Sequence, residues 1–179
     1  MRIEKVFEYD INDELRAKLQ QLLLECFPGD YPQDRIYFKQ LPHFRFIAFD
    51  YNNKPVGQVG LDYRVMNLNG KRIRILGIID LCVSNNFRLQ GLGSSLLSEI
   101  DNFCEGRSID FILLFADNKK LYLKAGFKSV KCKCKWLQIN DEDQTTYGIG
   151  HERIHELMVK KVGTEQWKDG DIDLLGYLY

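Results

Sequence analysis

A turn that carries two glycines is the segment of this 179-residue chain whose chemistry is easiest to interpret. It runs from Arg88 to Gly93, after an apolar stretch that ends at Val83 and before a stretch with helical periodicity. Backbone N–H groups at a helix N-terminus bind anions, and glycines let a phosphate approach them closely. The guanidinium of Arg88 and the hydroxyl of Ser94 would add hydrogen bonds. The pattern therefore predicts a phosphate-binding turn.

Two nucleotide-binding motifs do not fit this turn. A P-loop needs a Gly-Lys-Ser/Thr sequence, whereas two serines follow Gly93. A dinucleotide-binding fingerprint needs a third glycine where Leu96 stands, and it needs a preceding βαβ unit. The segments before the turn indicate an antiparallel meander instead, so we expect another kind of phosphate ligand.

The elements before the turn follow from hydrophobic spacing and turn residues. Leucines at helical spacing predict a helix from a cap at Asp10 or Asn12 to about Phe27. A second, shorter helix is expected over 35–41. Strand-like runs, with asparagine-containing turns between the later ones, cover 2–9, 43–50, 56–67 and 72–83.

The elements after the turn alternate between helix and strand. A stripe of apolar residues predicts a helix over 92–104, and a continuous apolar run predicts a buried strand over 109–116. A short helix over 119–124 ends at Gly126 and precedes an alternating strand over 127–139.

The remaining sequence predicts a polar loop over 140–150 and a last strand over 156–162. The order of elements predicts one α/β domain over 1–179, with a mixed, mostly antiparallel central sheet flanked by helices. Its core would cover about 44–137, and 140–179 would be a C-terminal elaboration.

Two motifs together resemble the GNAT superfamily of N-acetyltransferases. The turn is similar to the acetyl-CoA signature Arg/Gln-x-x-Gly-x-Gly/Ala, and it stands between a strand and a helix as that family requires. The segment from Asn118 to Phe127 resembles the family's Asn-x-x-x-Tyr-x-x-x-Gly-Phe pattern. The likeness spans about 46–136. It implies a GNAT-like acyl-CoA N-acyltransferase fold with acetyl-CoA as co-substrate.

The resemblance also implies where acetyl-CoA binds. In this family the strand that matches Leu81 to Val83 bonds the pantetheine arm through its backbone, and the turn after it cradles the pyrophosphate. Asn118 and Tyr122 would lie beside the thioester sulfur. The cofactor-binding residues expected on this basis are Leu81, Cys82, Val83, Arg88, Leu89, Gln90, Gly91, Leu92, Gly93, Ser94 and Asn118.

Direct attack of an amine on the thioester would require two proton transfers. Tyr122 is the candidate general acid, because a tyrosine with an ordinary pKa of about 10 is neutral at pH 7 and can protonate the departing thiolate. Asp80, an acid inside an apolar strand, is the candidate base, and acids at that position recur in the superfamily. A chain of waters is the alternative base, and a structural role for the aspartate stays open. A backbone N–H near 81–83 could stabilise the oxyanion.

Both ends of the chain resemble a subgroup, the aminoglycoside 2′-N-acetyltransferases. The segments 27–31 and 167–171 are similar to segments that flank the GNAT core in those enzymes. This likeness implies that Asp30 and Trp167 bind the acceptor. Ile79 stands where the subgroup has a glutamate, with an aspartate adjacent.

Other motifs have simpler interpretations. The sequence His-Glu-Arg-Ile-His over 151–155 matches the zincin motif, but its charged arginine and the strand-like residues after it argue against a zinc site. Cys132 and Cys134 fall on one strand face, where core packing is expected. Acylation of Cys82 is the alternative to direct transfer.

Charge and cysteine usage limit the partners. Twenty-five basic and 25 acidic residues give a formal net charge of zero, which argues against bulk attraction to nucleic acid or to an anionic membrane. Residues 139–179 contain nine acids and four bases, an excess that would attract a cationic substrate. Five cysteines, no signal-like start and no long apolar run predict a cytoplasmic protein with reduced thiols.

Three functions remain open at this point. The favoured one is acetyl transfer to a primary amine in a ternary complex, with a small cationic acceptor such as an aminoglycoside-like molecule or a polyamine. The alternatives are a non-catalytic acyl-CoA-binding module and an acetyltransferase for protein N-termini or lysines. No metal is expected, and the resemblance allows a homodimer.

Overall fold

A computed structural model describes all 179 residues and divides them into two compact units. Unit 1 comprises Met1–Leu61 and Ile79–Asn102, and unit 2 comprises Asp62–Ile78 and Phe103–Tyr179. Strands β3 and β4 run from one unit into the other, and each unit has a hydrophobic core of its own. The bounds of these strands are Pro55–Leu68 for β3 and Lys71–Val83 for β4.

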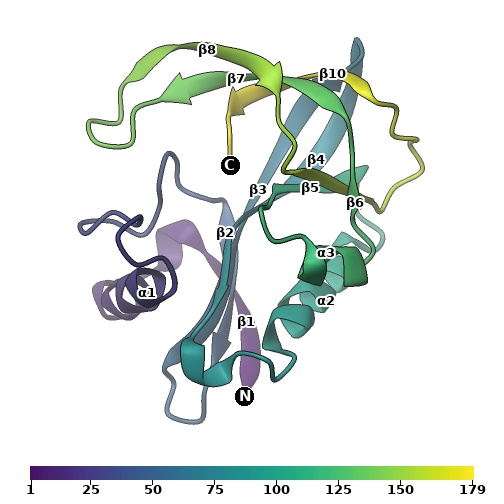
Figure 1. The fold of residues 1–179 in the computed structure, drawn as a ribbon. Helices are drawn as coiled ribbons and strands as arrows, with labels where there is room; N and C mark the ends of the chain where they lie inside the picture. Colours follow the sequence, from purple (N-terminus) through teal and green to yellow (C-terminus); the bar gives the residue numbers. More distant parts are fainter. The chain divides into compact units, whose positions relative to one another are not determined.

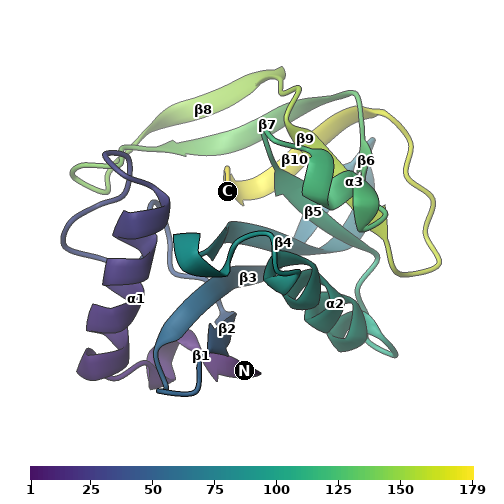
Figure 2. The same ribbon diagram turned by 60° about the horizontal axis from the view of Figure 1, so that its bottom comes forward.

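Unit 1 is a short antiparallel sheet with a helix on each face. Its further elements are β1 (Arg2–Phe7), the 3-10 turn η1 (Glu8–Asp10), α1 (Asp13–Cys26), β2 (Phe44–Phe49), the 3-10 turn η2 (Asn85–Phe87) and α2 (Leu92–Cys104). Strand β1 pairs with β2, and β2 pairs with the first part of β3. Figures 1 and 2 show α1 and α2 on opposite sides of these strands.

The two helices of unit 1 form where the sequence predicts them. The side chain of Asn12 accepts a hydrogen bond from the Leu15 N–H at 2.9 Å and so caps α1. The buried leucines of α1, including Leu19 and Leu23, pack with Ile47 of β2 in one core. Helix α2 has the predicted bounds, 92–104. Its apolar stripe is buried, as amphipathic spacing requires.

The short helix predicted over 35–41 is wrong, because this segment has no regular structure. One carbonyl of this segment and one just before it bond side chains of other elements. The carbonyl of Ile36 accepts from the guanidinium of Arg45 at 2.6 Å, and Pro32 O accepts from the Gln20 amide at 2.6 Å. Tyr31 and Ile36 are buried in the core of unit 1, so tertiary contacts outweigh helical propensity here.

Unit 2 is built mainly from strands. Its elements are β5 (Phe111–Phe115), α3 (Lys120–Lys124), β6 (Lys128–Ser129), β7 (Cys132–Ile139), β8 (Thr146–Arg153), β9 (Leu157–Lys161) and β10 (Gly170–Tyr177). Two of the strand pairs are parallel, β4 with β5 and β10 with β7. The pairs β5–β9, β6–β9, β7–β8 and β10–β3 are antiparallel. The mixed, mostly antiparallel sheet of the sequence analysis is therefore confirmed.

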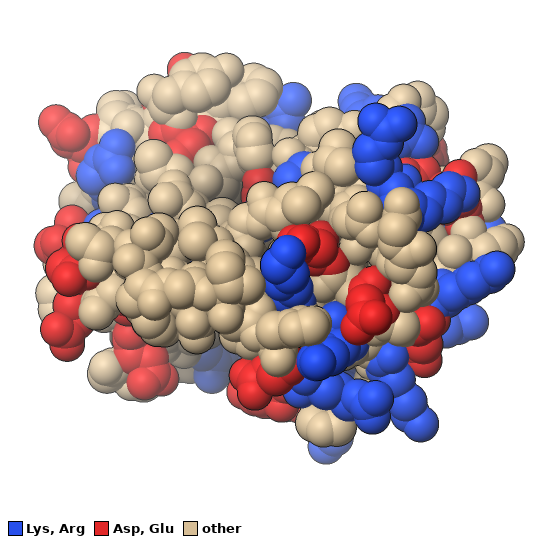
Figure 3. Space-filling model, turned by 90° about the horizontal axis from the view of Figure 1, so that it is seen from above, with Lys and Arg blue, Asp and Glu red and all other residues tan.

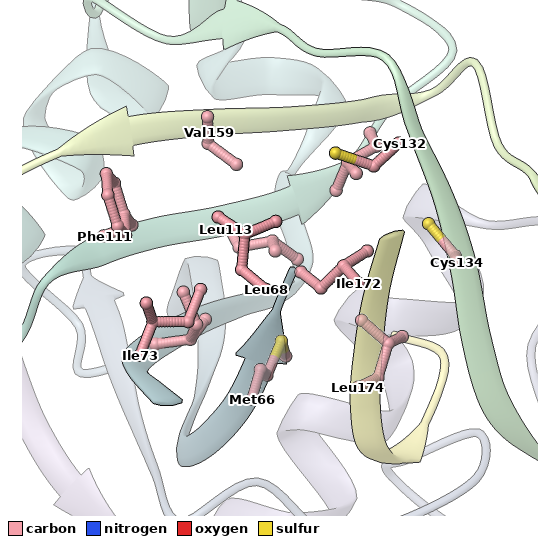
Figure 4. Packing of buried hydrophobic residues seen from close by; sticks show 12 residues of the cluster. Met66, Leu68, Ile73, Phe111, Leu113, Cys132, Cys134, Val159, Ile172 and Leu174 are labelled. Carbon is pink, nitrogen blue, oxygen red and sulfur yellow. The ribbon is translucent and has the colours of Figure 1, made fainter. Parts of the chain in front are cut away.

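The core of unit 2 is closed by side chains from most of its strands, as Figure 4 shows. Cys132 and Cys134 point into it and are fully buried, which confirms the packing role expected for them. Phe111 is also fully buried there. Because these side chains come from strands far apart in sequence, this core depends on long-range pairing.

Three predictions for unit 2 were wrong in their extent. The polar loop covers only 140–145, since β8 begins at Thr146. The predicted strand 127–139 is two strands, and β10 follows the strand that was predicted to be last. Strands β8 and β10 contain Gly148, Gly150, Gly170 and Gly176, which lower strand propensity, so their neighbouring strands stabilise them instead.

The surface in Figure 3 shows acidic and basic side chains in mixed groups and a broad area that carries neither. This mixing agrees with the zero formal net charge. None of the helices has the length and apolar character that crossing a membrane requires.

Candidate active site

The turn between η2 and α2 has the backbone of an anion-binding site. Leu89 and Gly91 adopt left-handed conformations, with φ of 61° and 84°. A Cβ at Gly91 would meet no atom within 4 Å, so the space above the turn is open. The Ser95 N–H donates to Gly91 O at 3.0 Å, which is the first hydrogen bond of α2. The N–H groups of residues 92–94 precede it. They have no partner within the helix and can bind phosphate oxygens.

Side chains of the turn support its shape. Arg88 is exposed, and its Nε donates to the carbonyl of Val83 at 3.0 Å. The amide of Gln90 donates to Asn86 O at 2.9 Å. These bonds leave part of the Arg88 guanidinium for a ligand. The residues predicted to hold the pyrophosphate therefore fit that group.

Glu25, which the sequence analysis did not identify, ties α1 to the start of this turn. One carboxylate oxygen accepts from the Ser84 hydroxyl at 2.9 Å and from the Asn85 N–H at 2.8 Å. The bond from the Asn85 N–H, with a smaller effect of Ser84, lowers the pKa of Glu25. No local motif marks this residue, because its partners lie about sixty positions away in the chain.

The end of β4 leads directly into the turn. Its parallel register with β5 covers Ile75 to Gly77, and the strand then continues to Val83. Leu81 and Val83 are half-buried, whereas Cys82 is buried. These three are the residues predicted to bond the pantetheine arm, and that role stays a prediction.

Asp80 distorts β4 just before those residues. Its φ of 49° lies in the left-handed region, which a non-glycine residue enters at a cost. The hydroxyl of Tyr31 donates to Oδ2 of Asp80 at 2.9 Å, and the amide of Gln58 donates to its carbonyl. Burial raises the pKa of Asp80, against the opposing effects of the Tyr31 hydrogen bond and the Arg45 charge. A carboxylate oriented in this way suits a base.

Tyr31 is the partner that the sequence analysis missed. It is buried between Phe27, with ring centroids 5.8 Å apart, and Phe38, at 4.6 Å. Burial, with the nearby Asp80 charge, raises the pKa of Tyr31. The hydroxyl therefore stays protonated and donates to the carboxylate. The sequence predicted Asp30 for the site, but its side chain is exposed, and its acceptor-binding role stays a prediction.

Unit 2 contains the other predicted site residues. Tyr122 is half-buried on α3 and packs edge-to-face on Phe127 at 5.8 Å between ring centroids. Asn118 accepts from the Lys120 N–H at 3.2 Å and so helps to begin α3. Trp167 packs edge-to-face on Phe111 at 5.2 Å, as part of the core. Their roles toward acetyl-CoA and acceptor remain predictions.

The zincin-like sequence does not form the zincin geometry. His151 to Arg153 end strand β8, and His155 follows in a turn. Two imidazoles on one helical face, which that motif requires, are therefore not formed.

A mixed sheet in which a strand runs through an anion-binding turn into a helix agrees with the acyl-CoA acyltransferase fold that the sequence resemblance implies. The family model described as "Acetyltransferase (GNAT) family" matches residues 16–127, which is more than half of the chain. The chain therefore belongs to the GNAT acetyltransferase family.

Solved structures share this fold at low sequence identity. The GNAT N-acetyltransferase YhbS from Escherichia coli in complex with CoA has a TM-score of 0.62 at 16% identity, over 97% of this chain and 89% of that one. An aminoglycoside 6′-N-acetyltransferase complexed with coenzyme A has 0.61 at 16%, over 93% and 99%. A GCN5-related N-acetyltransferase from Anabaena variabilis has 0.60 at 19%, over 72% of this chain and 32% of its own length. This chain thus spans about a third of the Anabaena protein.

Proposed function

We propose that this acetyltransferase moves the acetyl group of acetyl-CoA directly to a primary amine of a small cationic acceptor. The observation that carries the proposal is the Asp80 carboxylate, held by the Tyr31 hydroxyl on the strand that leads to the phosphate-binding turn. A carboxylate attracts an ammonium group and can accept its proton before the amine attacks. Tyr122 then donates a proton to the thiolate that leaves.

The state of Cys82 favours direct transfer over an acylated cysteine. A nucleophilic cysteine needs an accessible thiolate. Cys82 is buried, and the hydrogen bond to Cys26, together with burial, raises its pKa well above the ordinary value. Its thiol therefore stays protonated near neutral pH. Attack by the amine itself does not need this group.

Two features support a small polyamine or aminoglycoside-like acceptor. One structurally similar enzyme is an aminoglycoside 6′-N-acetyltransferase, although the likeness to it is one of fold. Nine acids against four bases in 139–179 would attract a cationic molecule. A panel of aminoglycosides, linear polyamines and lysine peptides, analysed for acetylated products by mass spectrometry, tests this choice. Acetylation of peptides alone would contradict it.

Acetyl-CoA is expected to stabilise the protein against heat, because it binds the native state only. A concentration of about 100 times Kd should add roughly 2.7 kcal/mol. Arg88→Ala should weaken binding about tenfold, since it removes charge-assisted hydrogen bonds to phosphate. Thermal melts and calorimetric titrations measure both effects. Arg72→Ala, which removes an exposed arginine near the start of β4, is the control and should bind normally.

Asp80→Asn is expected to lose activity and gain stability together. Because the pKa of Asp80 is raised in the folded state, ionisation costs stability as pH rises through that pKa. An asparagine cannot ionise, can still accept from Tyr31 and tolerates the left-handed backbone. We expect Tm to rise by roughly 2–4 °C at pH 8 and the difference to shrink toward pH 4.

Asp173→Asn is the matched control for that experiment. The hydrogen bond from Lys135 lowers the pKa of Asp173. The ionised carboxylate therefore stabilises the folded protein at pH values above the ordinary pKa of an aspartate, and this stability is lost as pH falls through the lowered pKa. This variant should therefore lower Tm slightly at pH 8 and keep its activity. Full activity in Asp80→Asn would show that a water chain, and not Asp80, accepts the proton.

A further inference from the structure

Two cysteines that are far apart in sequence meet in unit 1. Cys26 is the last residue of α1, and Cys82 lies near the end of β4. Cys82 belongs to the buried core of this unit, and Cys26 packs against that core while remaining half-buried. Glu25, the neighbour of Cys26 in α1, bonds the Ser84 hydroxyl and the Asn85 N–H, so the end of α1 lies beside the end of β4. A disulfide requires two cysteines on neighbouring segments of this kind, with Cα atoms about 4.4–6.8 Å apart.

The surroundings give the two sulfurs different chemistry. The hydrogen bond from Cys82 and the Arg88 guanidinium lower the pKa of Cys26 to about 7, although burial and the Glu25 charge oppose this. The same hydrogen bond and burial raise the pKa of Cys82. At neutral pH a substantial fraction of Cys26 is thus thiolate, and Cys82 stays a thiol. An accessible thiolate with a neighbouring thiol is the arrangement of redox-sensitive cysteines.

We propose that Cys26 and Cys82 form a peroxide-sensitive dithiol, in which Cys26 is the oxidised cysteine and Cys82 the resolving cysteine. The oxidant is a hydroperoxide. The Cys26 sulfur attacks one peroxide oxygen, the O–O bond breaks, and a sulfenic acid forms while hydroxide leaves. The Cys82 sulfur loses its proton and attacks the Cys26 sulfur, so the S–S bond forms and the S–O bond breaks. Two thiols are oxidised, and hydrogen peroxide becomes two waters.

The other three cysteines lack this arrangement. Cys104, Cys132 and Cys134 are all buried, so a peroxide has little access to them. Burial raises the pKa of Cys132, and it raises that of Cys134 to about 12. Neither forms a thiolate near neutral pH. Cys26 is the one cysteine that is not fully buried.

Arg88 connects the dithiol to the cofactor turn. The guanidinium that stabilises the Cys26 thiolate also belongs to the turn proposed to bind the pyrophosphate, and this step rests on the proposed function. Bound acetyl-CoA would draw Arg88 away from Cys26 and slow its reaction. The disulfide would in turn hold Cys82, on the strand expected to bind the pantetheine arm, against the end of α1.

The first test is a mass-spectrometric map of the full chain after treatment with hydrogen peroxide at neutral pH. We expect free thiols to fall from five to three, with a peptide cross-linked through Cys26 and Cys82 that a reductant separates. Cys26→Ser should retain its four thiols under the same treatment, and the control Cys104→Ser should still form the cross-link. Loss of two thiols in Cys26→Ser, or a different cross-link, would overturn the proposal.

The second test separates the dithiol from the cofactor. The alkylation rate of Cys26 by iodoacetamide is measured against pH, with and without acetyl-CoA. A midpoint near 7 supports the proposal, and a midpoint near that of an ordinary cysteine opposes it. Slower alkylation with acetyl-CoA supports the shared role of Arg88. If acetyl-CoA fails to stabilise the protein, the proposed function is wrong. The Cys26–Cys82 cross-link would still show whether the two cysteines form a peroxide-sensitive pair.

Discussion

Tyr122→Phe is expected to lower kcat about 100-fold or more, which is the usual contribution of a general acid. The change removes one hydroxyl and keeps the ring that packs on Phe127, so α3 should keep its structure. Without the hydroxyl, the thiolate must leave unprotonated or take a proton from water. The KM for acetyl-CoA and the Tm should change little. Steady-state kinetics with a thiol-detecting reagent measure the effect.

Tyr51→Phe provides the control for this variant, because it removes the same atom from an exposed tyrosine in a turn of unit 1. It should retain full activity. Equal losses in kcat and in cofactor affinity for Tyr122→Phe would indicate a binding role. Full activity in Tyr122→Phe would refute the acid assignment outright.

Arg45→Met is expected to destabilise the protein by about 3–5 kcal/mol, because it leaves a buried carboxylate without its cation. Arg45 is only 1% exposed and donates to both carboxylate oxygens of Glu8, at 2.8 and 3.2 Å. It also donates to Gln58 at 2.9 Å and to the carbonyl of Ile36. A Tm lower by roughly 10 °C should follow. Thermal and urea unfolding measure the loss.

The double variant Glu8→Gln with Arg45→Met should recover much of that stability, because no charge is then left buried. The exposed pair of Lys135 and Asp173 offers the comparison, with a distance of 2.8 Å. Lys135→Met should cost less than about 1 kcal/mol. A similar loss in both single variants would mean that the buried pair has no special role.

The parts of the site that the sequence predicted correctly depend on neighbours in the chain. Helix α2 follows from one apolar stripe, and the turn before it follows from two glycines and an arginine within six positions. Gly91 does adopt the left-handed conformation that such a turn uses. Such features can be predicted from the sequence because the backbone preferences of single residues and the spacing of near neighbours determine the local structure.

The parts that were missed depend on residues brought together from far along the chain. Tyr31 bonds an aspartate 49 positions later, and nothing near either residue indicates the other. Strand β10 pairs with β7 across a gap that includes two other strands, although its own glycines and acids disfavour a strand. The segment 35–41 is not helical, and its Ile36 is buried in the core of unit 1 with its carbonyl bonded to Arg45. Tertiary contacts decided each of these cases.

The passage of β3 and β4 through both units limits how this chain can be divided. Each unit is assembled from two separate stretches, so Met1–Leu61 is completed only by Ile79–Asn102, which lies beyond a stretch of unit 2. A fragment that stops before residue 79 would lack the turn, Asp80 and α2, and would also lack most of unit 2. Splitting the gene at one point therefore cannot yield either half as an intact module. An inserted tag or fusion partner should go into an exposed loop such as 140–145 instead.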